Sequence, residues 1–202
     1  MVEMSSDQKF AVDGQLTLSP DQKVILIAGP AGAGKTSIGK RIGSVDKWFH
    51  LSEDRIWDEL PRDPHTARTE SEKAIVQSRA IELIKSELRK GNSVALEFIV
   101  YDDPPQPIIF YQTQLASLGV PHYTKVLRPS VEDILARQDT RGNSHDRERE
   151  VADRRANAEH QVRCLSGEHI NPAWVVDSSA ISLEDVYHKH FVDLVETKSS
   201  NG

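Results

Sequence analysis

The feature that most constrains this chain is a glycine-rich loop between a short apolar run and an expected helix. The loop reads Gly29-Pro30-Ala31-Gly32-Ala33-Gly34-Lys35-Thr36 and matches the pattern G-x-x-x-x-G-K-[ST]. Glycines let successive backbone N–H groups point at phosphate oxygens, and the N-terminus of the following helix favours the same anion. The pattern predicts a nucleotide-binding P-loop. The Lys35 side chain is expected to point to solvent or to the β- and γ-phosphates, and the Thr36 hydroxyl to bind Mg²⁺.

The residues on either side of the P-loop supply the context that this motif requires. Residues 24–28 are all apolar, which is typical of a strand buried on both faces of a parallel sheet, and a helix is expected from Lys35 to about Ile42. From average residue usage, a chain of this length matches the motif by chance about once in a hundred cases. We therefore assign Ser37, together with the P-loop, to the nucleotide site. The G-x-G-x-x-G spacing of a dinucleotide site is not met here.

The rest of the chain alternates between strand and helix patterns. Further strands are expected at 49–51, 94–98, 123–127 and 174–176, and helices at 70–90, at about 111–118, from 130 onward and from 182 to 194. The pairs Ser130/Asp133 and Ser182/Asp185 resemble capping boxes at the starts of the last two helices. This alternation predicts an α/β fold of three layers, in which a five-stranded parallel sheet carries helices on both faces.

Length, charge and cysteine content limit the classes of protein that this chain can form. Its 202 residues suit one domain, which we place at 22–196, with a flexible N-terminal leader at 1–21 and a C-terminal tail at 197–202. A net charge of −6 and the lack of an apolar run of about 18 residues argue against nucleic-acid and membrane partners. The lone Cys164 cannot form an internal disulfide, and the N-terminus lacks a signal-peptide pattern, so we expect a cytoplasmic protein.

Four stretches of the chain, which together span about 23–191, carry a resemblance to known enzymes. They are residues 24–36, residues 50–57, the segment Arg137-x-x-x-Arg141-Gly142 and residues 175–179. In these stretches the chain resembles the small P-loop kinases of metabolites and antibiotics, such as the chloramphenicol phosphotransferase, gluconate kinase and shikimate kinase groups. The resemblance implies a nucleotide-kinase-like P-loop NTPase fold with a helical lid at about 137–163. It also implies ATP and Mg²⁺ as cofactors.

Asp54 is the candidate base that this resemblance indicates. In such kinases an acidic residue just after the second strand faces the substrate hydroxyl, and Asp54 is the matching residue; Arg55 beside it is assigned to the substrate site as well. Shikimate-kinase-like members carry a second aspartate two residues earlier, where this chain has Ser52, so the metal-linked role of that aspartate is not carried over. Asp54 also suits the N-cap of a helix through Leu60, and both roles can coexist.

Glu97 is a second acidic candidate because it lies inside the apolar run 94–98. A buried carboxylate is costly unless it is paired or metal-linked, and ligands of open parallel sheets bind at the carboxyl ends of the strands. Glu97 could hold Mg²⁺-bound water or a substrate hydroxyl, with a structural salt bridge as the alternative, and we expect it to be the partner of Asp54. Tyr101, on the following loop, is assigned to the substrate site, although a solvated loop explains it equally well.

The segment from 137 to 163 is rich in arginine. Its arginines are Arg137, Arg141, Arg147, Arg149, Arg154, Arg155 and Arg163. Acidic residues are almost as frequent there, so a solvated helical hairpin accounts for most of these side chains. Phosphoryl transfer is helped by a guanidinium that a closing lid delivers to the transferring group, and the resemblance assigns this role to Arg137 and Arg141. Cys164, His160 and His169 do not form the four-ligand set that is usual for zinc.

Together these assignments predict an ATP-dependent phosphotransferase that moves the γ-phosphate of Mg-ATP to a hydroxyl group of a small molecule, a metabolite or an antibiotic. Lys35 and the lid arginines would stabilise charge on the phosphoryl group, and Asp54 or Glu97 would be the base. Adenine would lie between the lid base and the loop after Asp177. A nucleoside or nucleotide kinase is the alternative, followed by an ATPase without an acceptor; the N-K-x-D element of a switch GTPase is absent. A monomer or homodimer is expected.

Overall fold

A computed structural model of the chain describes residues 16–61, 68–141 and 151–196, with the Arg141 side chain outside the description. The first described residues include Leu16 and Leu18, which pack against the core without forming a strand. The side-chain amide of the buried Gln22 donates to the backbone carbonyls of Leu88 and Asn92 at 2.6 and 3.1 Å. These two hydrogen bonds attach the segment before the first strand to the rest of the domain.

Five parallel strands form the centre of the molecule, as the sequence predicts. They are β1 (Val24–Ala28), β2 (Trp48–Ser52), β3 (Ser93–Phe98), β4 (His122–Leu127) and β5 (Val175–Val176), in the spatial order β2-β3-β1-β4-β5. Every neighbouring pair is parallel, so all carboxyl ends lie at one edge of the sheet. The last strand is shorter than expected, because Trp174 belongs to a 3₁₀ turn, η1 (Pro172–Trp174), that the Asn171 side chain caps.

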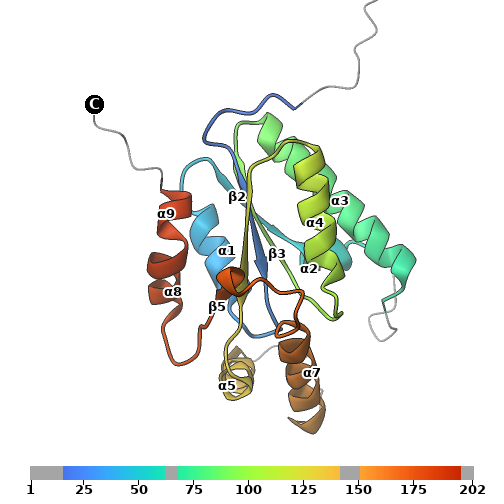
Figure 1. Ribbon diagram of the computed structural model, residues 1–202, viewed down its shortest axis with the longest axis vertical. Coiled ribbons are helices and arrows are strands. Elements are labelled where there is room, and N and C mark those ends of the chain that lie inside the picture. The colour runs from blue at the N-terminus through green and yellow to red at the C-terminus, as the bar shows by residue number, and fades with distance from the viewer. Residues whose placement is uncertain (1–15, 62–67, 142–150, 197–202) are drawn as a thin grey trace, which may run out of the picture.

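Helices cover both faces of this sheet. The helices of the described residues are α1 (Lys35–Gly43), α2 (Glu53–Asp58), α3 (Glu70–Arg89), α4 (Gln106–Ser117), α5 (Val131–Arg141), α7 (Val151–Cys164), α8 (Leu183–His190) and α9 (Val192–Val195). Helices α3 and α4 lie on one face, and α1, α8 and α9 lie on the other (Figure 1). This is the predicted three-layer α/β/α arrangement. None of the helices in the described part of the chain is long and apolar enough to cross a membrane.

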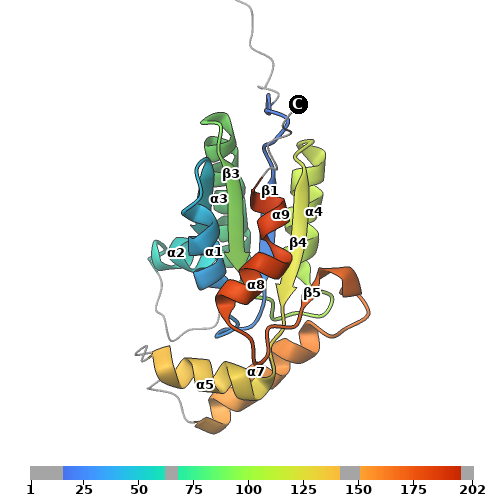
Figure 2. The same ribbon diagram turned by 90° about the vertical axis from the view of Figure 1, so that its left-hand side faces the viewer.

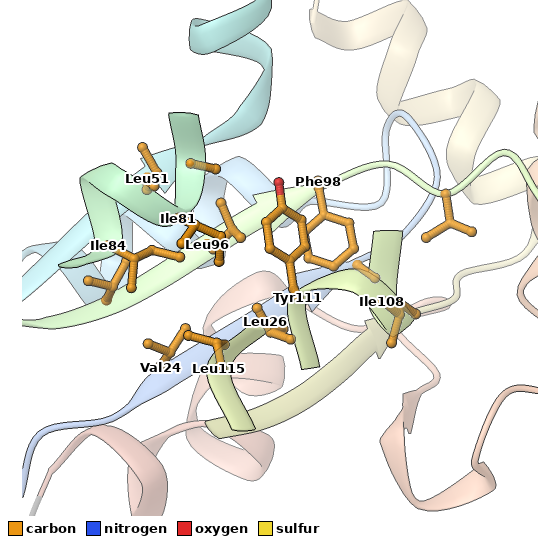
Figure 3. Close-up of a cluster of buried hydrophobic side chains, with 14 of the residues drawn as sticks. Val24, Leu26, Leu51, Ile81, Ile84, Leu96, Phe98, Ile108, Tyr111 and Leu115 are labelled. Carbon is orange, nitrogen blue, oxygen red and sulfur yellow. The ribbon is translucent and has the colours of Figure 1, made fainter. Parts of the chain in front are cut away.

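Each face of the central strand packs against its own helical layer. Leu26 of β1 belongs to the cluster that includes Leu96 of β3 and Tyr111 of α4 (Figure 3). Its neighbour Ile27 points the other way and packs with Ile38 of α1. All five residues of β1 are fully buried, which explains why the strand has an unbroken apolar sequence instead of an alternating one.

Short polar side chains start several helices where the sequence indicates. Ser130 and Ser182 accept hydrogen bonds from the backbone N–H groups of Asp133 and Asp185, each at 3.1 Å, so both capping predictions are confirmed. The N-cap of α2 is Ser52, whereas the sequence analysis considered Asp54 for that position. Asp54 lies in the first turn instead, where the helix dipole favours a carboxylate. This two-residue difference decides which acid near β2 is buried.

Two helices lie across the carboxyl ends of the strands, in the place assigned to the lid. Figure 2 shows α5 and α7 crossing each other below the arrowheads of the sheet. Arg154 of α7 pairs with Asp139 of α5 at 2.7 Å, and Arg155 pairs with Glu132 at 3.2 Å. Two of the arginines in this segment therefore join the lid helices to each other. Arg147 and Arg149 lie outside the described residues.

Candidate functional site

The P-loop has the backbone conformation that its glycines allow. Gly32 and Gly34 have φ angles of 93° and 96°, in the left-handed region that is strained for residues with a side chain. Of the two orientations expected for the Lys35 side chain, toward solvent or toward the phosphates, the structure does not show the first. The side chain is 7% exposed, and its Nζ donates to the Pro30 carbonyl at 2.9 Å. The ammonium group is therefore held along the loop from which it would reach a phosphate.

Two glutamine side chains from the lid helices hold the tip of the P-loop. Gln161 of α7 accepts a hydrogen bond from the Ala31 N–H at 2.8 Å, and Gln138 of α5 donates to the Ala31 carbonyl at 3.1 Å. Both glutamines are buried, so these bonds are shielded from competition by water. The position of Ala31 is thus set by both lid helices as well as by the loop's own backbone.

The two arginines assigned to the lid differ in what the structure shows of them. Arg137 donates to the Ala33 carbonyl at 3.2 Å and to the Ser178 carbonyl at 2.6 Å. Its guanidinium lies at the P-loop and joins that loop to the segment after β5, the region where adenine was expected. Arg141 is the last residue of α5. The charge-stabilising role of both residues stays a prediction.

A buried hydrogen-bonded chain connects the P-loop to strands β2 and β3. Thr36 donates from Oγ1 to Glu97 Oε2 at 3.0 Å, and His50 Nε2 lies 3.1 Å from Glu97 Oε1. An ionised carboxylate only accepts hydrogen bonds, so His50 Nε2 carries the proton in this arrangement. The expected pairing of Glu97 with Asp54 is wrong, because both Glu97 oxygens are engaged by other residues, and Asp54 instead lies 3.8 Å from Arg68.

The surroundings of Glu97 keep its carboxylate ionised. Burial raises the pKa of Glu97, but the hydrogen bond from His50 and the nearby charge of Lys35 outweigh burial, and the pKa lies below 4.5. A carboxylate beside the Thr36 hydroxyl is a pair of hard oxygen donors of the kind that Mg²⁺ prefers, and nucleotide phosphates and water supply the other ligands. The described residues contain no group of three or more His, Cys, Asp and Glu that could hold a metal. The Thr36 hydroxyl and the Glu97 carboxylate, 3.0 Å apart, fit Mg²⁺ by the chemistry of their oxygen donors.

The two residues assigned after β2 lie at the surface of α2. The Asp54 side chain is 60% exposed, and Oδ1 is 3.8 Å from an Arg68 nitrogen, too long for a hydrogen bond. Arg55 is also exposed. Both residues lie in the helix that follows β2, close to the carboxyl edge of the sheet, where the acceptor is expected.

A pocket opens between α2, α3 and the loop after β3. It is lined by Glu53, Trp57, Arg68, Lys73, Gln77, Ile99, Tyr101, Asp102 and Pro107. Glu53 directly follows β2 and Ile99 directly follows β3, so the pocket lies at the same edge of the sheet as the P-loop. The structure thus brings Tyr101 to the pocket, while Asp54 and Arg55 are not part of its lining.

The pocket carries charges of both signs beside an aromatic wall. The Arg68 guanidinium lies 4.3 Å from the centre of the Trp57 ring, a favourable cation–π distance. Lys73 donates to Glu70 at 2.8 Å and lies 3.9 Å from Asp102. The lining thus combines charged side chains with an aromatic surface.

Glu53 is a buried acid of this pocket that the sequence analysis missed. It is 7% exposed, and the Tyr111 hydroxyl donates to its Oε1 at 2.5 Å. Burial raises the pKa of Glu53 to about 7, against the lowering effect of the Tyr111 hydrogen bond. A carboxyl that titrates near neutral pH can take or release a proton at a binding site. The sequence feature that indicates its burial is spacing: Ile56 and Trp57 follow Glu53 by three and four residues, so the three side chains share the buried face of α2.

Helix α7 also contacts the loop that carries Tyr101. His160 Nε2 lies 2.9 Å from the Tyr101 carbonyl, and Cys164 Sγ donates to the same oxygen at 3.4 Å. These two side chains, considered above only as metal ligands, therefore attach the lid to the border of the pocket. One helix touches both the P-loop and the pocket loop.

Comparison with protein families gives a match over most of the chain. A family model described as AAA domain matches residues 24–163, a segment that begins with β1 and includes the P-loop, the pocket and both lid helices. No protein among the curated sequences matches the chain.

Solved structures share the fold at low sequence identity. The tunicamycin resistance protein of Deinococcus radiodurans has a TM-score of 0.60 at 15% identity, over 83% of this chain and 95% of its own. The APS kinase of Mycobacterium tuberculosis, in complex with AMPPNP and APS, has a TM-score of 0.59 at 15% identity, over 89% and 100%. A gluconokinase from Sinorhizobium meliloti 1021 has a TM-score of 0.59 at 14% identity, over 85% and 91%. The chain therefore shares its fold with these three proteins, two of which are described as kinases.

Proposed function

The chain belongs to the AAA-domain family, and from this premise we propose that it is an ATP-dependent phosphotransferase. In this proposal the γ-phosphate of Mg-ATP moves to a hydroxyl group of a small molecule, a metabolite or an antibiotic. The nucleotide would bind to the P-loop and Ser37, and the acceptor would bind in the pocket between α2, α3 and the loop after β3. The protein would act in the cytoplasm as a monomer or homodimer.

The observation that carries this proposal is that two binding regions lie at one edge of the sheet. The P-loop follows β1, the pocket lies at the ends of β2 and β3, and β3 is the strand between β1 and β2. A hydrolase needs only a water molecule beside the γ-phosphate, whereas a transferase must hold a second substrate in line with it. A side-chain-lined pocket beside the P-loop supports the second case.

The residues of the P-loop have distinct tasks in this proposal. Thr36 and Glu97 would hold the Mg²⁺ of the nucleotide, which when bound neutralises charge on the β- and γ-phosphates. The Lys35 ammonium would exchange the Pro30 carbonyl for a phosphate oxygen and stabilise charge that develops on the transferred group. Arg137 and Arg141 are proposed to add positive charge from the lid.

Two neighbouring acids are candidates for the group that acts on the acceptor hydroxyl. Asp54 is our first choice, because the resemblance indicates it and its exposed carboxylate is available to a ligand. Glu53 is the second, because it lines the pocket itself and has a pKa of about 7. Glu97 is less suited, because both of its oxygens are already engaged. Arg55 and Tyr101 are proposed as further acceptor contacts.

The descriptions of the structural neighbours are consistent with this reaction class. One is an APS kinase solved with AMPPNP and APS, and another is a gluconokinase. A third is named for resistance to tunicamycin. These names favour transfer to a small molecule over simple ATP hydrolysis, and a nucleoside or nucleotide kinase remains the alternative.

The proposal is tested by incubating the protein with ATP, Mg²⁺ and a panel of metabolites, antibiotics and nucleosides, with the products identified by mass spectrometry. One compound should gain a phosphoryl group as ADP forms. Lys35→Ala should lower this rate by about 10²-fold or more while the protein still unfolds cooperatively, because a preorganised charge at the phosphoryl group is lost. Formation of ADP at one rate with and without every compound would contradict the proposal and favour an ATPase. A phosphorylated nucleoside would favour the alternative kinase.

A further inference from the structure

His50 lies in a slot formed by residues that lack bulky side chains. In the register of β2 with β3 it is opposite Ala95, and helix α1 packs against the same strand. A Cβ atom added to Gly39 would lie 2.4 Å from both Cδ2 and Nε2 of His50, and one added to Gly43 would lie 2.9 Å from the His50 Cβ. Neither glycine can carry a side chain while the imidazole keeps its place, because interiors are close-packed.

The glycines of this slot are unfavourable for the helix that contains them. Gly39 lies in the middle of α1 and Gly43 is its last residue, and a glycine in a helix interior is less stable than alanine by about 1 kcal/mol. Their four-residue spacing places both on one face of the helix, and that face meets His50. Helix α1 therefore contains residues of low helix propensity at the positions where the imidazole approaches its backbone.

From this slot the imidazole reaches a carboxylate that also contacts the P-loop. His50 Nε2 is 3.1 Å from Glu97 Oε1, and Thr36 Oγ1 is 3.0 Å from Glu97 Oε2. Residues two apart on a strand share a face, so the small Ala95 side chain leaves the path from His50 to Glu97 open. The side chains of His50 and Glu97 are only 12% and 3% exposed, and water does not readily replace this contact.

We propose that His50 is a positioning residue for the metal of the bound nucleotide. It fixes the orientation of the Glu97 carboxylate, so that this group and the Thr36 hydroxyl face the Mg²⁺ together. The inference rests on the proposed function, because it takes Thr36 and Glu97 as the residues that hold the metal. Hydrogen bonds to metal-binding carboxylates typically change metal affinity by about 10–100-fold when they are removed.

The test is the binding of a non-hydrolysable ATP analogue, measured by calorimetry over a range of Mg²⁺ concentrations. His50→Leu removes the donor and should raise the Mg²⁺ concentration for half-maximal enhancement of binding by about 10-fold or more. Affinity for the analogue without Mg²⁺ should stay within about twofold of wild type, because the P-loop contacts remain. His50→Gln restores an N–H donor of similar reach and should recover most of the Mg²⁺ affinity.

Gly39→Ala makes the same test without changing any hydrogen-bonding group. The added methyl group displaces the imidazole from Glu97 although alanine is the better helix former, so the Mg²⁺ requirement should rise as in His50→Leu. Lys40→Ala, at an exposed position of the same helix, is the matched control and should behave as wild type.

Two results overturn the inference. If wild type responds to Mg²⁺ and both His50→Leu and Gly39→Ala respond at the same concentration, His50 does not position the metal ligand, and the proposed function is untouched. If wild type binds the analogue with no dependence on Mg²⁺, the inference and the proposed metal site fail together. Thermal unfolding of each variant distinguishes the positioning role of His50 from a purely structural role. A purely structural role would lower stability and leave the Mg²⁺ requirement unchanged.

Discussion

Glu53 and Asp54 are adjacent carboxyl groups that the fold places in opposite surroundings. Helix α2 begins at Glu53 after the N-cap Ser52, and successive side chains of a helix point about 100° apart. Glu53 therefore turns into the pocket beside Tyr111, and Asp54 turns out to solvent near Arg68. Burial raises the pKa of Glu53 to about 7, whereas the Asp54 carboxylate is exposed on the outer side of the same helix turn.

Asp54→Asn tests the acid that we propose as the base. The substitution keeps the size and removes the charge, and the side chain lies away from the P-loop contacts. ATP affinity should change by less than about threefold, or roughly 0.7 kcal/mol, while transfer to the acceptor should fall by about 10²-fold, the usual effect of losing a positioned base. Titration calorimetry and initial rates measure the two quantities. A collapse of ATP affinity would instead make Asp54 a nucleotide or metal ligand.

Glu53→Gln tests the raised pKa of the buried acid. A carboxyl whose pKa is higher in the folded protein than in the unfolded chain stabilises the fold at low pH, and this contribution is lost as the pH rises from about 4.5 to about 7. The free energy of unfolding of wild type, relative to the glutamine variant, should therefore fall by about 3 kcal/mol over that range. Denaturant titrations at several pH values measure it. Parallel curves for the two proteins would show that Glu53 ionises as an ordinary surface acid.

At the scale of elements, α7 joins the P-loop to the loop that borders the pocket. Gln161 holds the P-loop at Ala31, while His160 and Cys164 hold the carbonyl of Tyr101 at the pocket. These residues lie within one turn of α7, so a displacement of the helix would alter both sites at once. This arrangement is what a lid needs in order to respond to nucleotide and acceptor together.

The variant Gln161→Leu tests whether the hydrogen bond between α7 and the P-loop stabilises the protein. The variant leaves the half-buried Ala31 N–H without its acceptor, which costs about 1–3 kcal/mol. For a domain of this size we expect the melting temperature to fall by roughly 3–10 °C, read from thermal unfolding followed by circular dichroism. Arg163→Ala, at an exposed position of the same helix, is the control and should melt within about 1–2 °C of wild type. Equal melting of both variants would show that α7 does not hold the P-loop.

At the scale of the whole molecule, the sequence predicts the features that depend on local pattern. The P-loop, the five parallel strands and the caps at Ser130 and Ser182 follow from spacing and residue type. The partners of Glu97 could not be predicted, because they depend on the register of β2 with β3 and on the closeness of α1. The buried position of Glu53 could not be predicted either, because it depends on where α2 begins. Ser52 and Asp54 both suit an N-cap, so the sequence does not fix that start.

In the proposed function, the P-loop and the pocket are two halves of one transfer site. In this view the family match and the low-identity likeness to kinases supply the fold, and the pocket beside β3 supplies the acceptor site. Replacing a residue of the pocket wall should therefore affect transfer and leave hydrolysis by water unaffected. Trp57 is part of that wall, and the Arg68 guanidinium lies 4.3 Å from the centre of its ring.

The most direct test follows the γ-phosphate itself, with ATP labelled at that position and the acceptor identified from the compound panel. With wild type, the label should appear in the acceptor, and little should appear as inorganic phosphate. With Trp57→Ala, in protein shown by circular dichroism to be folded because Trp57 also packs in the core, transfer to the acceptor should fall by about 10-fold or more, which corresponds to a loss of about 1.4 kcal/mol, while ATP affinity is retained. Label that passes to inorganic phosphate at the same rate with and without acceptor, in both proteins, would contradict the account.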